Sequence, residues 1–314
     1  MPSQRRLTRA ASRATASSRR AAACAPGVLA SRHVPGVLEL APPTARPVPV
    51  VLDSPHSGAH YPDDFGHCMS QQGLRRLEDA FVDELFERAP AIGAALLRAL
   101  FPRSYIDPNR APDDIDLRML HDEWPHPANP GPKSECGIGL IFRHAAEGPL
   151  YRRKLSAAEV RRRLDRYYWP YHRTLEQALE RTWLSFGAVL HLNCHSMRSV
   201  SSPAMPEGDG VARPDFVLGD RDGTTCDPAL TQWVRAFLEE AGYAVSVNAP
   251  YKGVELVRRY SDPARGRHSL QIEINRALYM DEHAVRKTGG FTALKRALES
   301  LTAAAGARML VRAA

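Results

Sequence analysis

The stretch that decides the fold is Val50-Val51-Leu52-Asp53-Ser54-Pro55-His56-Ser57-Gly58. An aliphatic run ends in a polar turn, as expected of a buried strand that delivers a histidine to the edge of a sheet. The pattern recurs at residues 188–196, which end in Cys194-His195-Ser196, and residues 269–276 carry Glu273 among aliphatic side chains. Two histidines and a carboxylate at strand ends indicate a metal-dependent hydrolase, because sites in open α/β sheets collect beyond the carboxyl ends of the strands.

Each of these residues also has a structural explanation. A single histidine in an apolar run is more often a hydrogen-bonded core residue than a metal ligand. A carboxylate inside a strand is rarer, because burying an unpaired charge is expensive. Glu273 is therefore stronger evidence for a functional site than either histidine. Cys194 could act as a nucleophile beside His195, but neighbouring side chains of a strand face opposite ways.

Strand-like and helical segments alternate along the chain. Helical patterns cover residues 74–99, 156–185, 228–240 and 291–304, and further short strands are expected at 215–220 and 243–248. This alternation predicts an α/β fold with three layers, in which helices cover both faces of a mostly parallel mixed sheet. A loop at about 122–139 is rich in proline and glycine, and loops of this length often act as lids.

The charge of the chain is unevenly distributed. Residues 1–33 contain seven of the 42 basic residues and no acidic residue, and the remaining 35 basic residues equal the 35 acidic ones. We therefore expect a disordered leader over residues 1–33 and a single domain over residues 34–314. The high isoelectric point then gives no argument for a nucleic-acid partner.

Other features of the composition restrict the location of the protein. No apolar run approaches the roughly 18 residues of a membrane span, so no membrane partner is expected. Five cysteines, an odd number, show no paired spacing for a metal, which predicts a reducing cytoplasm. The oligomeric state does not follow from the sequence.

A hydrolytic zinc centre needs about three protein ligands and an open position for water. His56 and His195 are natural ligands, whereas His191 lies about 13 Å from His195 along an extended strand. The third ligand should be a carboxylate, and Asp79 and Asp83 lie one turn apart on the expected helix. Glu273 suits the general base that takes a proton from metal-bound water.

Five arginines lie beside predicted strand ends or the long loop: Arg110, Arg118, Arg143, Arg198 and Arg276. A guanidinium group holds a carboxylate through two parallel hydrogen bonds. Several convergent arginines would imply a small dicarboxylate substrate. The chain contains no Gly-x-Ser-x-Gly elbow, phosphate-binding loop, dinucleotide fingerprint or His-Glu-x-x-His helix, which removes the competing catalytic patterns.

Six motifs in order resemble those of the N-formylglutamate amidohydrolase family, over residues 35–301. They are Asp53-Ser54-Pro55-His56-Ser57-Gly58, Asp79-Ala80-Phe81-Val82-Asp83-Glu84-Leu85, Ile106-Asp107-Pro108-Asn109-Arg110, Asn193-Cys194-His195-Ser196-Met197, Asn248-Ala249-Pro250-Tyr251-Lys252-Gly253 and Gln271-Ile272-Glu273-Ile274-Asn275-Arg276. The chain is similar, more distantly, to the zinc carboxypeptidases and the aspartoacylase-like deacylases. This resemblance implies a zinc-carboxypeptidase-like fold.

The resemblance also implies roles for individual residues. His56, Asp83 and His195 would bind zinc, and Glu273 would be the base. The carboxypeptidases place their acidic ligand three residues after the first histidine; Ala59 occupies that position here, so the ligand must come from the following helix. Asn109 and Arg110 would hold the substrate carboxylate, and we add Arg143 and Arg276 as candidates for the same task.

The function implied by the resemblance is metal-dependent hydrolysis of N-formyl-L-glutamate to formate and L-glutamate, at the end of histidine degradation. One alternative is a zinc carboxypeptidase or deacylase that acts on another N-acyl amino acid or a peptide. A second alternative is a binding protein that kept the fold and lost the chemistry. Retention of both histidines and Glu273 argues against that alternative.

Overall fold

The computed structural model describes residues 29–146, 148–202 and 208–313. Most of the expected leader, residues 1–28, lies outside these ranges. The expected boundary at residue 33 is too late, because Arg32 and His33 belong to strand β1 and pair with Leu40 and Glu39 of strand β2.

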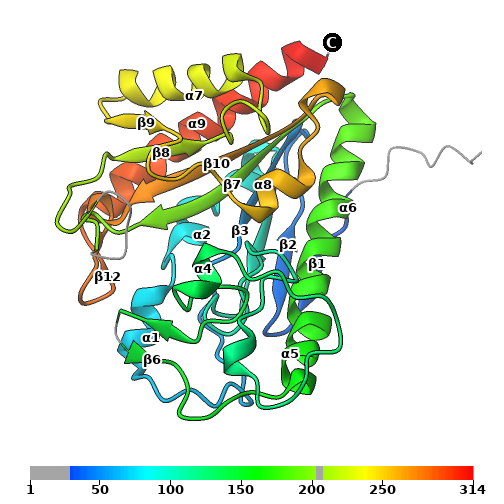
Figure 1. Ribbon diagram of the computed structural model, residues 1–314. Coiled ribbons are helices and arrows are strands. Elements are labelled where there is room, and N and C mark those ends of the chain that lie inside the picture. Colours follow the sequence, from blue (N-terminus) through cyan, green and yellow to red (C-terminus); the bar gives the residue numbers. More distant parts are fainter. Residues whose placement is uncertain (1–28, 147, 203–207, 314) are drawn as a thin grey trace, which may run out of the picture.

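An eight-stranded sheet runs through the molecule in the order β1-β2-β4-β3-β7-β10-β8-β9 (Figure 1). The pairs β4–β3, β3–β7, β7–β10 and β8–β9 are parallel, and the other three pairs are antiparallel. The strands of this sheet are β1 (Arg32–Val34), β2 (Leu38–Ala41), β3 (Val50–Ser54), β4 (Ala95–Ala99), β7 (Val189–Met197), β8 (Phe216–Gly219), β9 (Val245–Val247) and β10 (Arg267–Asn275). The predicted mixed, mostly parallel sheet is confirmed. At its centre β3, which leads into His56, lies beside β7, which carries His195, and β7 lies beside β10, which carries Glu273.

Helices cover both faces of the sheet, as predicted (Figure 1). The helices are α1 (Gln71–Leu77), α2 (Val82–Leu85), α3 (Ala89–Ile92), α4 (Pro132–Glu135), α5 (Ala157–Arg163), α6 (Trp169–Phe186), α7 (Pro228–Glu240), α8 (Glu255–Tyr260) and α9 (Gly290–Ala313). One core lies between the sheet and α5, α6 and α8, and a second core lies between the opposite face and α2, α3, α7 and α9. Two small hairpins, β5 (His144–Ala145) with β6 (Gly148–Pro149) and β11 (Met280–Asp281) with β12 (Arg286–Lys287), complete the strands.

The expected helix over residues 74–99 is wrong. The chain instead forms three short helices, α1 to α3, and then strand β4. Phe81 adopts a left-handed conformation (φ 67°), and Gly93 does so at the end of α3 (φ 99°), so no continuous helix can form. The run Ala95–Ala99 is rich in Ala and Leu, which favour helix, but burial in the sheet overrides that preference.

The helix expected over residues 156–185 is present in two parts. Ser156 and Glu159 form a capping box at the start of α5. A π-helical turn over Leu164–Tyr168 joins α5 to α6 just before Pro170. Pro170 explains this division of the helix, because proline has no N–H to donate to the preceding turn.

Candidate metal centre

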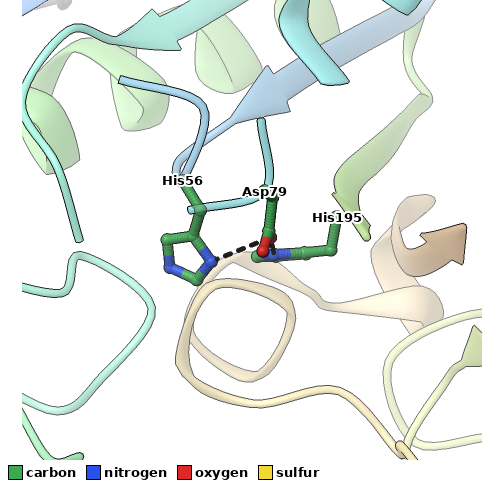
Figure 2. Close-up of side chains that lie close together, drawn as sticks. All are labelled: His56, Asp79 and His195. Carbon is green, nitrogen blue, oxygen red and sulfur yellow. Dashed lines mark hydrogen bonds and ion pairs between the residues drawn. The ribbon is translucent and has the colours of Figure 1, made fainter. Parts of the chain in front are cut away.

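Three buried side chains meet beyond the carboxyl ends of the central strands: His56, Asp79 and His195 (Figure 2). Their potential ligand atoms all lie within 4.8 Å of one another. His56 follows β3, His195 lies near the end of β7, and Asp79 follows α1. The backbone N–H of Asp79 donates to the carbonyl of His56 at 3.0 Å, which ties the two segments together.

Both histidines direct Nδ1 at the same carboxylate oxygen. Asp79 Oδ2 lies 3.2 Å from His56 Nδ1 and 3.0 Å from His195 Nδ1. The other ring nitrogens face different groups: His56 Nε2 lies 2.7 Å from Asp107 Oδ1, and His195 Nε2 lies 2.8 Å from Asn193 Oδ1. Each histidine therefore has an oxygen acceptor for an Nε2–H.

The charge state of Asp107 supports this assignment for His56. Burial alone would raise the pKa of Asp107, but its interaction with His56, and then the charges of Arg103 and Arg110, hold it well below its ordinary value. An ionised carboxylate only accepts hydrogen bonds, so His56 Nε2 must carry the proton. For His195, burial lowers the pKa to about 4, so its imidazole is neutral near pH 7.

A metal ion binds only an unprotonated imidazole nitrogen, and when each ring keeps its proton on Nε2, both Nδ1 atoms present lone pairs beside Asp79 Oδ2. Three electron-rich atoms in contact repel one another unless a cation lies among them. Two imidazoles and one carboxylate form a ligand set that suits a divalent transition metal, and outer partners that fix the histidine tautomers are typical of such sites. The residues present therefore fit a bound metal ion.

The opposite oxygen of Asp79 is held by two arginines. Arg276 Nη2 lies 3.0 Å from Asp79 Oδ1, and Arg103 Nη1 lies 3.4 Å from it. Arg103 also binds Asp107 Oδ2 at 2.9 Å, so it bridges Asp79 and the partner of His56. This pairing neutralises the buried carboxylates and leaves Oδ2 of Asp79 directed at the histidines.

Asp83, the expected acidic ligand, lies outside this cluster. Its side chain is about a quarter exposed, and its carboxylate lies 3.9 Å from Arg98. The chain turns sharply between Asp79 and Asp83 at the left-handed Phe81, so the two acids do not share a helix face. The structure thus brings Asp79, the alternative allowed by the sequence, between the two histidines.

Glu273 lies on β10 directly beside His195 of β7. Its carboxylate accepts a hydrogen bond from Gln271 Nε2 at 2.8 Å. Burial, and then the negative charge of Asp79, raises the pKa of Glu273 to about 8. A carboxyl group whose pKa lies near neutral pH, beside a candidate metal site, has the property expected of a proton-transfer group.

The four residues expected to bind substrate occupy different positions. Arg110 is buried beside the cluster and donates to the carbonyls of Asn109 and Ile138. Asn109 Oδ1 accepts from Leu256 N, and its Nδ2 lies 3.1 Å from His195 Nε2. Arg276 donates to Asp79, Ser196 and a backbone carbonyl. Arg143 lies farther out, paired with Asp116 at 2.7 Å.

The long loop contacts this region. Within residues 122–139 the chain forms the short helix α4, and Ile138 then accepts a hydrogen bond from Arg110. Leu140, immediately after the loop, accepts from the backbone N–H of Asp107. The end of the loop therefore supports the segment that carries Asp107, Asn109 and Arg110.

Sequence reasoning missed three residues of this site, namely Arg103, Asp107 and Asn193. Asp107 and Asn193 lie within motifs that the sequence made visible, but only the folded chain shows that each faces a histidine. Arg103 stands outside every motif, and no signal in the sequence identifies it.

The chain thus combines an open α/β sheet with a buried histidine–carboxylate cluster beyond the carboxyl ends of its central strands. The family model for N-formylglutamate amidohydrolase matches residues 48–280. The chain belongs to the N-formylglutamate amidohydrolase family, which confirms the predicted family and the predicted class of amide-hydrolysing enzyme.

Individual relatives agree with this assignment. The N-formylglutamate deformylase of Pseudomonas putida is 32% identical over 241 residues, which cover 75% of this chain and 83% of that protein. The deformylase of Pseudomonas aeruginosa is 32% identical over 243 residues, with 76% and 84% coverage. The crystal structure of N-formylglutamate amidohydrolase from Ralstonia eutropha JMP134 superimposes with a TM-score of 0.84 at 47% identity, and covers 87% of this chain and 98% of that one.

A more distant structure shares the fold. A gene product of Agrobacterium tumefaciens superimposes with a TM-score of 0.62 at 19% identity, over 87% of this chain and 96% of that one. Within the part of the chain that the structure describes, no helix is both long and apolar enough to cross a membrane.

Proposed function

We propose that the protein hydrolyses the amide of N-formyl-L-glutamate to formate and L-glutamate, with a divalent metal ion held by His56, Asp79 and His195. The observation that carries the proposal is the convergence of both histidine Nδ1 atoms on one Asp79 oxygen, with Glu273 on the neighbouring strand. Zinc is the ion we propose, because two imidazoles, one carboxylate and an open position form its usual hydrolytic ligand set.

Each part of the site has a separate task in this reaction. When bound, the metal ion polarises the formyl carbonyl and supplies water that ionises near neutral pH. Glu273 takes the proton from the attacking water and passes it to the departing amino group of glutamate. Asp107, Asn193 and Arg103 hold the histidines and Asp79 in place. Arg110 binds a carboxylate of the substrate with the guanidinium donors that its two carbonyl partners leave available.

The names of the relatives support the choice of substrate, since proteins 32% and 47% identical are described as N-formylglutamate deformylase and amidohydrolase. A panel assay tests it directly. Purified protein with one equivalent of zinc is offered N-formyl-L-glutamate, N-formyl-L-glutamine, N-acetyl-L-glutamate and a peptide ending in glutamate, and the release of each product is measured. The proposal expects the highest kcat/KM for N-formyl-L-glutamate. Preference for the acetyl compound or the peptide would identify a deacylase or a carboxypeptidase instead.

We also propose that the protein works in a reducing compartment, the cytoplasm. Among the described residues, Cys68, Cys136, Cys194 and Cys226 are all free thiols, which supports this proposal. Localisation of a fluorescent fusion of the full chain, compared with markers of the cytoplasm and the cell envelope, tests it.

A further inference from the structure

A row of buried polar side chains lies on one face of the central strands. On β7, Leu190, Leu192 and Cys194 face the core formed with α7 and α9. The alternate residues, His191, Asn193 and His195, face the opposite side and are equally buried. The parallel register places Asp53 of β3 beside Asn193. Asp53 has no exposed surface, and burying a carboxylate is costly unless hydrogen-bond donors replace the water it loses.

Asp53 accepts hydrogen bonds from three groups. Its Oδ2 accepts from the Tyr171 hydroxyl at 2.7 Å, and its Oδ1 lies 2.9 Å from His191 Nε2 and 2.7 Å from Asn193 Nδ2. Burial alone would raise the pKa of Asp53, but these partners, led by His191, lower it below its ordinary value. Asp53 is therefore an ionised acceptor that can face only donors.

The charge of Asp53 fixes the orientation of the Asn193 amide. Since a carboxylate cannot donate, Asn193 must direct its NH2 group at Asp53 and its carbonyl oxygen the other way. That oxygen lies 2.8 Å from His195 Nε2. Asp53 thus acts on His195 through Asn193: it fixes which end of the amide faces the His195 ring. We call this chain of two hydrogen bonds the Asp53–Asn193 relay.

A second amide competes for the same ring nitrogen. Asn109 Nδ2 lies 3.1 Å from His195 Nε2, and Asn109 cannot flip freely because its Oδ1 accepts from the backbone N–H of Leu256. His195 Nε2 therefore lies between an acceptor, Asn193, and a donor, Asn109. With the proton on Nε2, the ring donates to Asn193 and Nδ1 presents a lone pair that a metal ion can bind. With the proton on Nδ1, the ring donates to Asp79 Oδ2, accepts from Asn109, and cannot bind a metal ion through Nδ1.

We propose that Asp53 is a positioning residue for His195: it orients the Asn193 amide, whose oxygen stabilises the Nε2–H tautomer against the Nδ1–H tautomer that Asp79 favours in the metal-free protein, and so makes Nδ1 available to a metal ion at a lower cost. His56 needs no such relay, because Asp107 contacts its Nε2 directly. The inference rests on the metal centre of the proposed function, but the tautomer of His195 can be measured without any metal.

The first test is the zinc affinity of the intact chain, measured by competition with a chelator. Asn193→Leu removes the acceptor, and Asp53→Asn removes the charge that orients it. We expect each to weaken zinc binding by about 10- to 100-fold, as is typical for outer partners of metal ligands. The matched control is Tyr171→Phe, which removes a hydrogen bond from the other oxygen of the same carboxylate and should leave zinc affinity unchanged. Equal losses in all three variants would indicate general damage to the core and overturn the proposal.

The second test asks whether Asp53 acts through Asn193. Asp53→Asn should cost no further zinc affinity in an Asn193→Leu background, because the relay is already broken. Losses that multiply in the double variant would show that Asp53 acts by another route and would overturn the relay.

The third test reads the tautomer directly. Long-range proton–nitrogen NMR spectra of metal-free, 15N-histidine-labelled protein are recorded, and the His195 signal is identified by its loss in His195→Gln. We expect a measurable Nε2–H population in the wild type and its loss in favour of Nδ1–H in Asn193→Leu and in Asp53→Asn. An unchanged tautomer ratio in both variants would overturn the inference even if zinc binds tightly. Wild-type protein that shows the Nε2–H but binds no zinc would instead contradict the proposed metal centre. The two variants break the same pair at different residues, so the test survives if one of them fails to fold.

Discussion

His195 and Glu273 are register partners on the adjacent parallel strands β7 and β10. Neighbouring strands lie about 4.8 Å apart, and the two side chains project from the same face. Gln271, two residues before Glu273, donates to its carboxylate and limits its freedom. The sheet itself therefore holds the proposed proton acceptor beside the proposed metal ligand His195, with no loop needed to bring them together.

Replacing Glu273 by Gln should stop catalysis without removing the metal. The side chain is a proton-transfer group in our account, so kcat should fall by at least the 10²–10⁴-fold typical of such groups, while zinc content and melting temperature stay near those of the wild type. Steady-state kinetics, metal analysis and thermal unfolding of the same preparation check this. Early melting combined with near-normal turnover would show that Glu273 serves a structural ion pair instead.

Arg110→Lys should mainly raise KM. The buried guanidinium is a planar fork, and an ammonium group offers a point charge that cannot hold a carboxylate in the same bidentate manner. The measurement compares kcat/KM for N-formyl-L-glutamate and N-formyl-L-glutamine in the wild type, Arg110→Lys and Arg143→Lys. If Arg143→Lys loses the discrimination and Arg110→Lys keeps it, the outer arginine binds the substrate carboxylate.

His172 should make the fold sensitive to acid. Its ring contacts the Tyr260 hydroxyl and the Pro108 carbonyl, and burial lowers its pKa from 6.5 to about 3. Between these pH values the unfolded chain binds a proton at His172 that the native protein does not. The contribution of neutral His172 to the free energy of unfolding is therefore fully present above pH 6.5 and decreases as the pH falls below that value. At pH 5 the loss should be about 2 kcal/mol relative to neutral pH.

The variant His172→Gln isolates this contribution, because an amide can still donate to Pro108 and accept from Tyr260 without titrating. Urea unfolding of both metal-free proteins at pH 7.5 and pH 5.0 gives the comparison. The variant should lose less stability on acidification than the wild type by roughly the same 2 kcal/mol. Identical pH dependences would mean that His172 is not the acid-sensitive group.

The central strands of the sheet could be predicted from the sequence, because buried strands appear as continuous aliphatic runs. The runs that contain Asp53, His191 and Glu273 became the adjacent strands β3, β7 and β10. Strand β4 was not readable, since its short run of Ala and Leu has the composition of a helix and only its position in the sheet makes it a strand. Most of the site follows from strand ends, which is why His56, His195 and Glu273 could be named together.

The choice between Asp79 and Asp83 could not be made from local sequence. It depends on the left-handed conformation of Phe81, which interrupts the helix that would have placed both acids on one edge. A bulky residue with positive φ leaves no mark in sequence periodicity. The partners Arg103 and Asp107 were likewise hidden, because their roles depend on contacts with His56 and Asp79 across the fold.

The most direct test of the metal centre is the zinc stoichiometry of Asp79→Asn and Asp83→Asn. Both variants and the wild type are purified separately by the same procedure and dialysed against the same zinc buffer. Asp79 touches both histidines, whereas Asp83 lies beside Arg98. The account predicts that the wild type and Asp83→Asn each retain one zinc ion per chain and hydrolyse N-formyl-L-glutamate, and that Asp79→Asn loses both the ion and the activity. Retention of zinc by Asp79→Asn together with its loss from Asp83→Asn would contradict the proposed centre.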